Sequence, residues 1–172
     1  PALRADVQRN IGEDPEAPPR TYARLINDAI SARPKEMAVC MHVCRGNFAG
    51  NWMAEGGYDP VAEVLFNEID VDGYFLEYDT ARARGFEPLR FLPKGKTVVL
   101  GLVTTKKGAL ESKDELKRRI DEAAKHCPLE QLALSPQCGF SSTLEGNKLT
   151  EADQWKKLAL CVKVATEVWG AV

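Results

Sequence analysis

The segment MAVCMHV, residues 37–43, decides the fold class of this 172-residue chain. It is an almost unbroken apolar run that carries His42 near its end, and Cys44 follows it directly. A run of this kind is typical of a strand buried on both faces, as in parallel sheets. Three further strand-like segments follow at residues 73–78, 97–104 and 131–136. We therefore expect a sheet of four strands that begins with residues 37–43.

Helical segments alternate with these strands, at residues 22–31, 60–69, 112–126 and 150–169. The first places four apolar residues on one face: Tyr22, Leu25, Ile26 and Ala29. The third opens with Ser112 and carries Glu115 three residues later, which is the pattern of a capping box. Alternating strands and helices predict an α/β fold with a parallel sheet and right-handed crossovers.

The composition predicts one globular domain over residues 1–172, because 44% hydrophobic and 28% charged residues are normal for a soluble domain. The formal net charge of −2 lacks the basic footprint of a nucleic-acid-binding protein. No stretch of about 18 apolar residues occurs, which excludes a membrane helix. The N-terminal PALRADVQRN has two arginines and no apolar centre, so we expect no signal peptide and a cytoplasmic location.

Five cysteines occur in the chain, at positions 40, 44, 127, 138 and 161. An odd count in a chain of this size argues against a disulfide framework, so each thiol is expected to be packed as a small apolar group or used in chemistry. We expect Cys40, Cys127 and Cys161 to be structural, since they lie deep in a strand, at a helix end and within a helix. Cys44 and Cys138 are then the two with a chemical role.

Polar and metal-binding residue types gather where each expected strand ends: His42 and Cys44, Glu77 and Asp79, Thr104 and Thr105, Gln137 and Cys138. The carboxyl ends of parallel strands lie at one edge of a sheet, where α/β proteins place their active sites. We therefore expect these side chains to converge on one face of the molecule.

Four of these residues have the chemistry of a metal site. His42 and Cys44 are two residues apart on an extended strand, so both side chains point to the same side. Alone, the pair fits a metal site and a strand end with an incidental histidine equally well. Glu77 closes an apolar strand, where a carboxylate needs a partner, and Cys138 leaves a strand in a Pro-Gln-Cys-Gly turn. Together they make a plausible tetrahedral set for zinc.

Three motifs carry a resemblance to a known family: MHVCRGNF at 41–48, FLEYDTARARGFEPL at 75–89 and LALSPQCGFSST at 132–143. In this order they resemble the catalytic C-terminal barrel of cobalamin-independent methionine synthases, and most of all its shorter, single-barrel relatives. The resemblance extends over essentially the whole chain. It implies a (β/α)8 barrel of the TIM type, methyltransferase activity and a zinc ion, with the ligands His42, Cys44, Glu77 and Cys138.

The resemblance also implies the chemistry. In the family, zinc binds the thiol of homocysteine as a thiolate, which attacks the methyl group of a methyl-folate and gives methionine. A zinc-bound thiol is deprotonated at neutral pH and still nucleophilic. The expected partners are therefore a small-molecule thiol and a methyl donor, with a folate, methylcobalamin or a corrinoid protein open as the donor. No nucleic-acid or membrane partner is expected.

Departures from the longer synthases of the family concern the substrates rather than the metal. Gln137 stands where they have Asp, and Thr104 lies in the segment where they have a histidine proposed as an acid. No general acid is therefore assigned. A longer loop, residues 45–58, holds Trp52, which either lines a pocket or packs the loop down. We take Trp52 and the strand-end Asp79 as candidate substrate-binding residues.

Only four strands are expected, whereas a (β/α)8 barrel needs eight. We therefore expect the chain to supply about the last four β/α units, since relatives have Asp-Glu directly before a sequence like PALR at residues 1–4. An open parallel sheet exposes edge strands and inner-face side chains. The chain is then expected to pair with the missing N-terminal half of the barrel or with a second copy of itself.

Two alternative functions stay open. The same scaffold could alkylate or cleave another thiol, such as coenzyme M, or the chain could be an inactive fragment that retains a structural zinc site. The complete set of four ligands favours a working metal site, whereas the missing half favours inactivity of the isolated chain.

Overall fold

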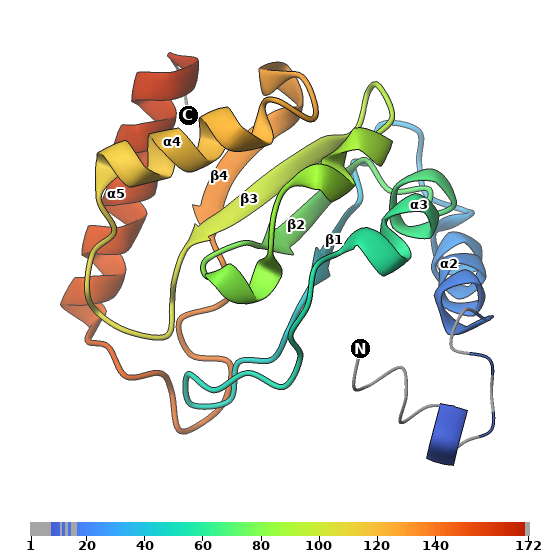
Figure 1. Ribbon diagram of the computed structural model, residues 1–172, viewed down its shortest axis with the longest axis horizontal. Helices are drawn as coiled ribbons and strands as arrows, with labels where there is room; N and C mark the ends of the chain where they lie inside the picture. Colours follow the sequence, from blue (N-terminus) through green and yellow to red (C-terminus); the bar gives the residue numbers. More distant parts are fainter. Residues whose placement is uncertain (1–7, 11, 13, 15–16, 171–172) are drawn as a thin grey trace.

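A four-stranded parallel sheet forms the centre of the computed structural model, which describes residues 8–10, 12, 14 and 17–170 (Figure 1). The strands lie side by side in chain order. Their bounds are β1 Cys40–Val43, β2 Gly73–Glu77, β3 Thr97–Val103 and β4 Leu132–Pro136. All three neighbouring pairs run parallel, so the predicted sheet of four parallel strands is confirmed.

Helices alternate with these strands as predicted. Within residues 17–170 the α-helices are α2 Ala17–Ile30, α3 Asp59–Asn67, α4 Lys113–Ala123 and α5 Glu151–Trp169. Short 3-10 helices lie in the connections, at η1 Ala81–Ala83, η2 Glu87–Phe91 and η3 Leu129–Gln131. Within this described part, no helix is long and apolar enough to span a membrane.

Two helix starts show what the sequence predicts well and what it does not. Thr150 and Asp153 form a capping box at the start of α5. The capping box predicted at α4 is wrong, because the Ser112 side chain makes no capping hydrogen bond. Glu115 pairs instead with Arg118, one turn further along the helix, at 2.6 Å. An opposite charge on the helix surface therefore takes the carboxylate that a capping box would use.

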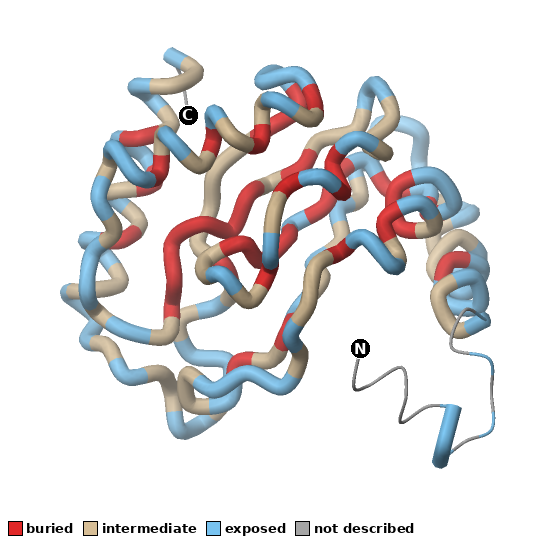
Figure 2. Tube along the Cα trace, in the orientation of Figure 1, coloured by how far each residue is buried: buried red, intermediate tan, exposed pale blue. Residues whose placement is uncertain are grey.

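The sheet is well covered on one face and open on the other. Residues of β2 and β3 that point to the covered face are at most 3% exposed: Tyr74, Leu76, Val98, Leu100 and Leu102. On the opposite face Phe75, in the middle of β2, is 37% exposed. Figure 2 shows the buried residues concentrated along these central strands.

The predicted burial of the first strand on both faces is therefore wrong. Cys40 and His42 are exposed, and Met41 and Val43 are only half-buried. β1 has β2 as its one neighbour among the described residues, and only the side that carries Met41 faces the core. An apolar run indicates a buried strand, but it does not show whether both faces find a partner.

Helix α2 leaves part of its predicted apolar face uncovered, although Ile26 of that face packs against the core. Tyr22 is 64% exposed and Leu25 is 58% exposed, while Ala23 is the residue of this helix that is buried. The helix contacts α3 and lies beyond the β1 side of the sheet (Figure 1). Uncovered apolar residues thus lie near the free edge of the sheet. The segment PALR, cited above for the missing first half, lies outside the described residues.

Candidate metal centre

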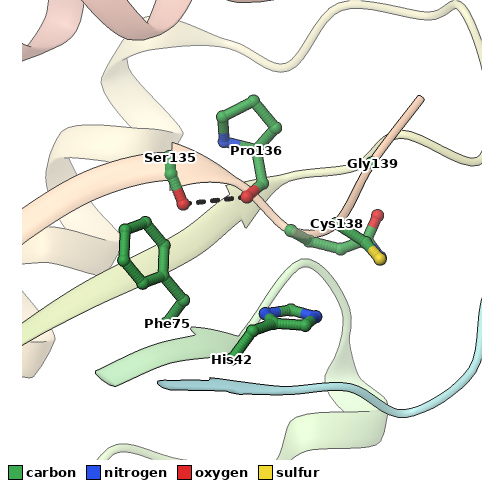
Figure 3. Close-up of a pocket in the computed structure, with 7 residues that line it drawn as sticks. His42, Phe75, Ser135, Pro136, Cys138 and Gly139 are labelled. Atoms are coloured by element: carbon green, nitrogen blue, oxygen red, sulfur yellow. Dashed lines mark hydrogen bonds between the residues drawn. The ribbon is translucent and has the colours of Figure 1, made fainter. Parts of the chain in front are cut away.

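The predicted ligands come from three strand ends. His42 lies in β1 and Cys44 directly follows it, Glu77 is the last residue of β2, and Cys138 lies two residues beyond β4. The ligand atoms of these four residues lie within 4.8 Å of one another, which meets the predicted convergence. Figure 3 shows the His42 ring and the Cys138 side chain next to each other.

A glycine in β3 lets the chain after β4 reach the end of β2, although β3 lies between them. A Cβ atom on Gly101 would stand 2.8 Å from the Gln137 Cα atom and 2.9 Å from the Leu76 carbonyl oxygen. Both distances are too short for any side chain at this position. The backbone of Gln137 therefore crosses over Gly101, and this crossing carries Cys138 towards Glu77.

The distances between the ligand atoms fit a small tetrahedral cation. The Sγ atoms of Cys44 and Cys138 are 4.0 Å apart, and Nε2 of His42 is 3.6 Å from Oε1 of Glu77. Two thiolates bound to a tetrahedral zinc lie ~3.8 Å apart, and a bound nitrogen and oxygen lie ~3.3 Å apart. These two pairs therefore need to contract by only a few tenths of an ångström, and the donor set of one imidazole, two thiols and one carboxylate fits such an ion.

The charges at the site call for a cation. A hydrogen bond with Cys138, and a second with Glu77, raise the pKa of His42 to about 10. The hydrogen bond with His42 is also the main reason why the pKa of Cys138 falls to about 7, although burial opposes this shift. In the metal-free chain above pH 7, the His42 imidazolium thus faces both the Cys138 thiolate and the Glu77 carboxylate. A metal ion would take over the role of that positive charge.

Glu77 is fully buried, with an exposed fraction of 0%. Burial alone would raise the pKa of its carboxyl, but the hydrogen bond with His42 and the nearby charge of Lys106 outweigh it, and the pKa is lowered. Oε1 accepts a hydrogen bond from Gln137, whereas Oε2 has no hydrogen-bond partner among the described residues. A buried carboxylate oxygen without a partner is what a bound cation would satisfy.

Asn47 ties the two cysteine-bearing segments together, and the sequence analysis did not single it out. Its Nδ2 atom donates to the Gly139 carbonyl at 2.8 Å and to the Ser142 hydroxyl at 2.9 Å. Ser142 Oγ in turn lies 3.9 Å from the Cys138 sulfur. The only sequence feature that could have indicated this role is the position of Asn47 three residues after Cys44. Spacing within a loop does not determine the direction of a side-chain amide.

The candidate substrate-binding residues Asp79 and Trp52 meet each other through Arg82 rather than joining the four ligands. Asp79 is 2% exposed and its Oδ1 atom lies 3.2 Å from the Arg82 guanidinium. The same guanidinium stacks over the Trp52 ring at 4.3 Å, and the Trp52 indole N–H donates to Glu55 at 2.8 Å. These contacts hold the loop after β1 against the end of β2, and a substrate role for either residue stays a prediction.

A cavity of about 300 Å³ opens next to the ligands. It is lined by His42, Phe75, Ser135, Pro136, Gln137, Cys138 and Gly139 (Figure 3). Phe75 belongs to the sheet face that the helices leave open, so the cavity lies on that face. The metal-binding group of residues therefore borders a space with apolar walls that a small molecule can enter.

Comparison with known proteins matches residues 14–167 to the catalytic domain of the cobalamin-independent synthases. Two Bacillus subtilis (strain 168) proteins, the uncharacterized YxjG and YxjH, are similar to the chain. YxjG is 54% identical over 160 residues, which are 92% of this chain and 42% of YxjG. YxjH is 52% identical over 165 residues, which are 95% of this chain and 44% of YxjH. The chain thus spans less than half the length of these relatives.

Two solved structures are similar as well. A candidate vitamin-B12-independent methionine synthase from Listeria monocytogenes matches with a TM-score of 0.68 and 39% identity, over 92% of this chain and 43% of that protein. A B12-independent methionine synthase from Shewanella sp. W3-18-1, solved with selenomethionine, matches with a TM-score of 0.64 over 88% of this chain and 46% of that protein. Its identity of 18% shows a shared fold alone. On the family match and these relatives, the chain belongs to the cobalamin-independent methionine synthase family, within its catalytic domain.

Proposed function

We propose that this chain carries the zinc site of a methyltransferase that transfers a methyl group to a small thiol. The observation that carries the proposal is one imidazole, two thiols and one buried carboxylate within 4.8 Å of one another, in a chain of this family. His42, Cys44, Glu77 and Cys138 would hold the ion. A bound zinc ion would supply the positive charge that keeps a thiol deprotonated at neutral pH. A reducing cytoplasm suits two free thiols, and we propose that compartment.

The thiol substrate of the proposed reaction is homocysteine. Its sulfur would attack the methyl carbon of the donor, so that a sulfur–carbon bond forms as the bond between the methyl group and the donor breaks. The cavity beside Cys138 offers the apolar surface of Phe75 and Pro136 to a short carbon chain. At about 300 Å³ it lies at the small end of ligand pockets, ~300–1,000 Å³, which suits a small thiol.

The methyl donor we propose is 5-methyltetrahydrofolate, with a methyl corrinoid as the alternative. Either donor is much larger than the cavity, so most of its binding surface would lie outside the described sheet. Coenzyme M is the alternative thiol, and an isolated chain without turnover is the third possible outcome. The substrate assay below distinguishes the folate donor, the corrinoid donor, coenzyme M as the thiol, and the absence of turnover.

We also propose that the four strands are half of a (β/α)8 barrel. The open sheet face, the free edge of β1 and the exposed Tyr22 and Leu25 support this view, since all three would be covered by neighbouring β/α units. The missing units would come from an N-terminal half or from a second copy of the chain. Mixing the purified chain with the part of YxjG that it does not match, followed by a solution mass measurement, tests this. A chain that stays monomeric alone and in the mixture would contradict it.

The metal proposal is tested by zinc analysis of three forms of the chain. Wild type should bind one zinc, and Cys138→Ser should bind it much more weakly, because a hydroxyl replaces a thiolate ligand. Cys40→Ser is the matched control, since Cys40 lies on the same strand as His42 but outside the ligand group. Equal zinc binding by all three forms would refute the ligand assignment.

The reaction is tested with the zinc-loaded chain, alone and with the unmatched part of YxjG. Homocysteine and coenzyme M are compared as thiols, and 5-methyltetrahydrofolate and methylcobalamin as donors, with products measured by mass spectrometry. Methionine from homocysteine, lost in Cys138→Ser and kept in Cys40→Ser, is the expected result. Zinc binding without any methylated thiol, in every combination, would favour the inactive fragment.

A further inference from the structure

The side chain of Gln137 is buried between two strand ends and contacts a proposed metal ligand. Its exposed fraction is 1%. Its Nε2 atom donates to Oε1 of Glu77 at 3.3 Å. Its Oε1 atom accepts from the Thr105 backbone N–H at 2.9 Å and from the Thr105 hydroxyl at 2.6 Å. Both ends of the amide are therefore engaged inside the protein.

Thr105 fixes which way the amide points. A backbone N–H can only donate, so the atom of Gln137 that faces it must be the acceptor oxygen. The amide NH2 group must then face Glu77, where a carboxylate accepts. The Thr105 hydroxyl adds a second donor on the same oxygen. An amide reversed by 180° would place NH2 against a backbone N–H, which leaves buried donors without acceptors.

The oriented amide donates to the carboxylate of Glu77. Glu77 is fully buried, and its Oε1 atom faces both the Gln137 amide and, at 3.6 Å, the His42 ring. A carboxylate at a strand end can turn about its last bonds unless a neighbour holds it. The Gln137 amide is the neutral donor in position to do so, and a neutral donor adds no competing charge to the site.

We propose that Gln137 is a positioning residue: oriented by Thr105, its amide holds the Glu77 carboxylate in the place from which it binds the metal. The inference rests on the zinc site of the proposed function. Partners that orient metal ligands typically change metal affinity by about 10–100-fold when they are lost. Thr105 acts through Gln137, whose amide oxygen accepts from both the backbone N–H and the hydroxyl of Thr105.

Zinc affinity of the full chain, measured by competition with a chelator, tests the proposal. Gln137→Met keeps the shape of the side chain and removes both hydrogen-bonding ends, so the zinc dissociation constant should rise about 10–100-fold. Thr105→Val removes one hydroxyl donor and keeps the N–H, so the rise should be about 2–10-fold, the worth of one hydrogen bond. Thr104→Val is the matched control, because the Thr104 hydroxyl accepts from the backbone N–H of Lys106, whereas Gln137 bonds to Thr105.

A double substitution separates positioning from a general loss of packing. If Thr105 acts through Gln137, adding Thr105→Val to Gln137→Met should weaken zinc binding no further. The absorption spectrum of the Co²⁺-loaded chain gives a second readout, since a displaced Glu77 alters the ligand geometry and with it the visible bands. Urea unfolding of each metal-free variant shows that it is folded.

The outcomes are distinct from those of the zinc proposal. Wild-type zinc affinity and an unchanged Co²⁺ spectrum in folded Gln137→Met would overturn the role of Gln137, even where Cys138→Ser loses the metal. Zinc binding that survives Cys138→Ser would instead overturn the site itself. If Gln137→Met does not fold, Thr105→Val alone decides, and wild-type affinity in that variant would overturn the proposal.

Discussion

Zinc binding by this chain should release protons, and the number released should fall as the pH rises. At pH 7, His42, with a pKa of about 10, carries one proton, and Cys138, with a pKa of about 7, carries about half of one. These protons must be lost when the imidazole and the thiolate bind metal. The two groups together therefore release about 1.5 protons at pH 7. At pH 8.5 the same sum is about 1.0, because Cys138 is then almost fully ionised.

The sign of the pH dependence follows from this release. Each proton that leaves on binding raises the apparent zinc affinity about tenfold for each unit of rising pH. The affinity should therefore increase with pH from 6 to 8.5, and the slope should fall by about one proton over this range as Cys138 ionises. The contribution of His42 should persist up to pH values near 10.

Isothermal titration calorimetry in buffers of different ionisation enthalpy measures the protons released per zinc. His126→Asn is the control, since His126 is the one other histidine of the sequence and is expected to leave the count unchanged. Release of less than half a proton at pH 8.5 would show that His42 is either not an imidazolium in the metal-free chain or not a ligand. A slope that does not change between pH 6 and 8.5 would contradict the assignment of Cys138.

Two further predictions concern the metal-free chain. Lys157→Met should lower the free energy of unfolding by about 3–5 kcal/mol, measured in urea. The substitution removes the fully buried ammonium that lies 3.0 Å from the carboxylate of Glu111. A loss below about 1 kcal/mol would contradict this prediction. Hydrogen peroxide should oxidise Cys44 and Cys138 to a disulfide, since their sulfurs are 4.0 Å apart and a disulfide needs ~2.05 Å. Bound zinc should prevent this oxidation. Peptide mapping that finds no disulfide between the two cysteines in the metal-free chain would contradict the geometry.

The arrangement of the ligands was predictable because two simple periodicities determine it. His42 and Cys44 share a side because strand side chains alternate, and the carboxyl ends of parallel strands lie at one edge. The ligand atoms within 4.8 Å of one another follow from these two facts together with residue types at strand ends. The identity of the metal does not follow from them and stays a prediction.

The contacts that hold the ligands in place were not predictable in the same way. Gln137, Asn47 and Thr105 all lie just beyond strand ends, where no periodicity fixes the direction of a side chain. Gln137 and Thr105 were predicted to lie among the converging strand-end residues, but not to bond to each other or to Glu77. These contacts depend on the backbone of Gln137 crossing over a glycine. The ion pair between Glu115 and Arg118, which forms in place of the predicted capping box, could not be predicted from the local sequence pattern either.

The two faces of the sheet differ in role: one packs against the helices, and the other borders the proposed metal site and the cavity. The covered face, with Leu76, Val98 and Leu100 at most 1% exposed, supplies the buried apolar contacts of the central strands. All four proposed ligands and the Gln137 amide lie at strand ends within this same chain. The open face is different, because the cavity wall at Phe75 is still 37% exposed. Metal affinity should therefore be a property of this chain alone, whereas methyl transfer should depend on whatever covers that face.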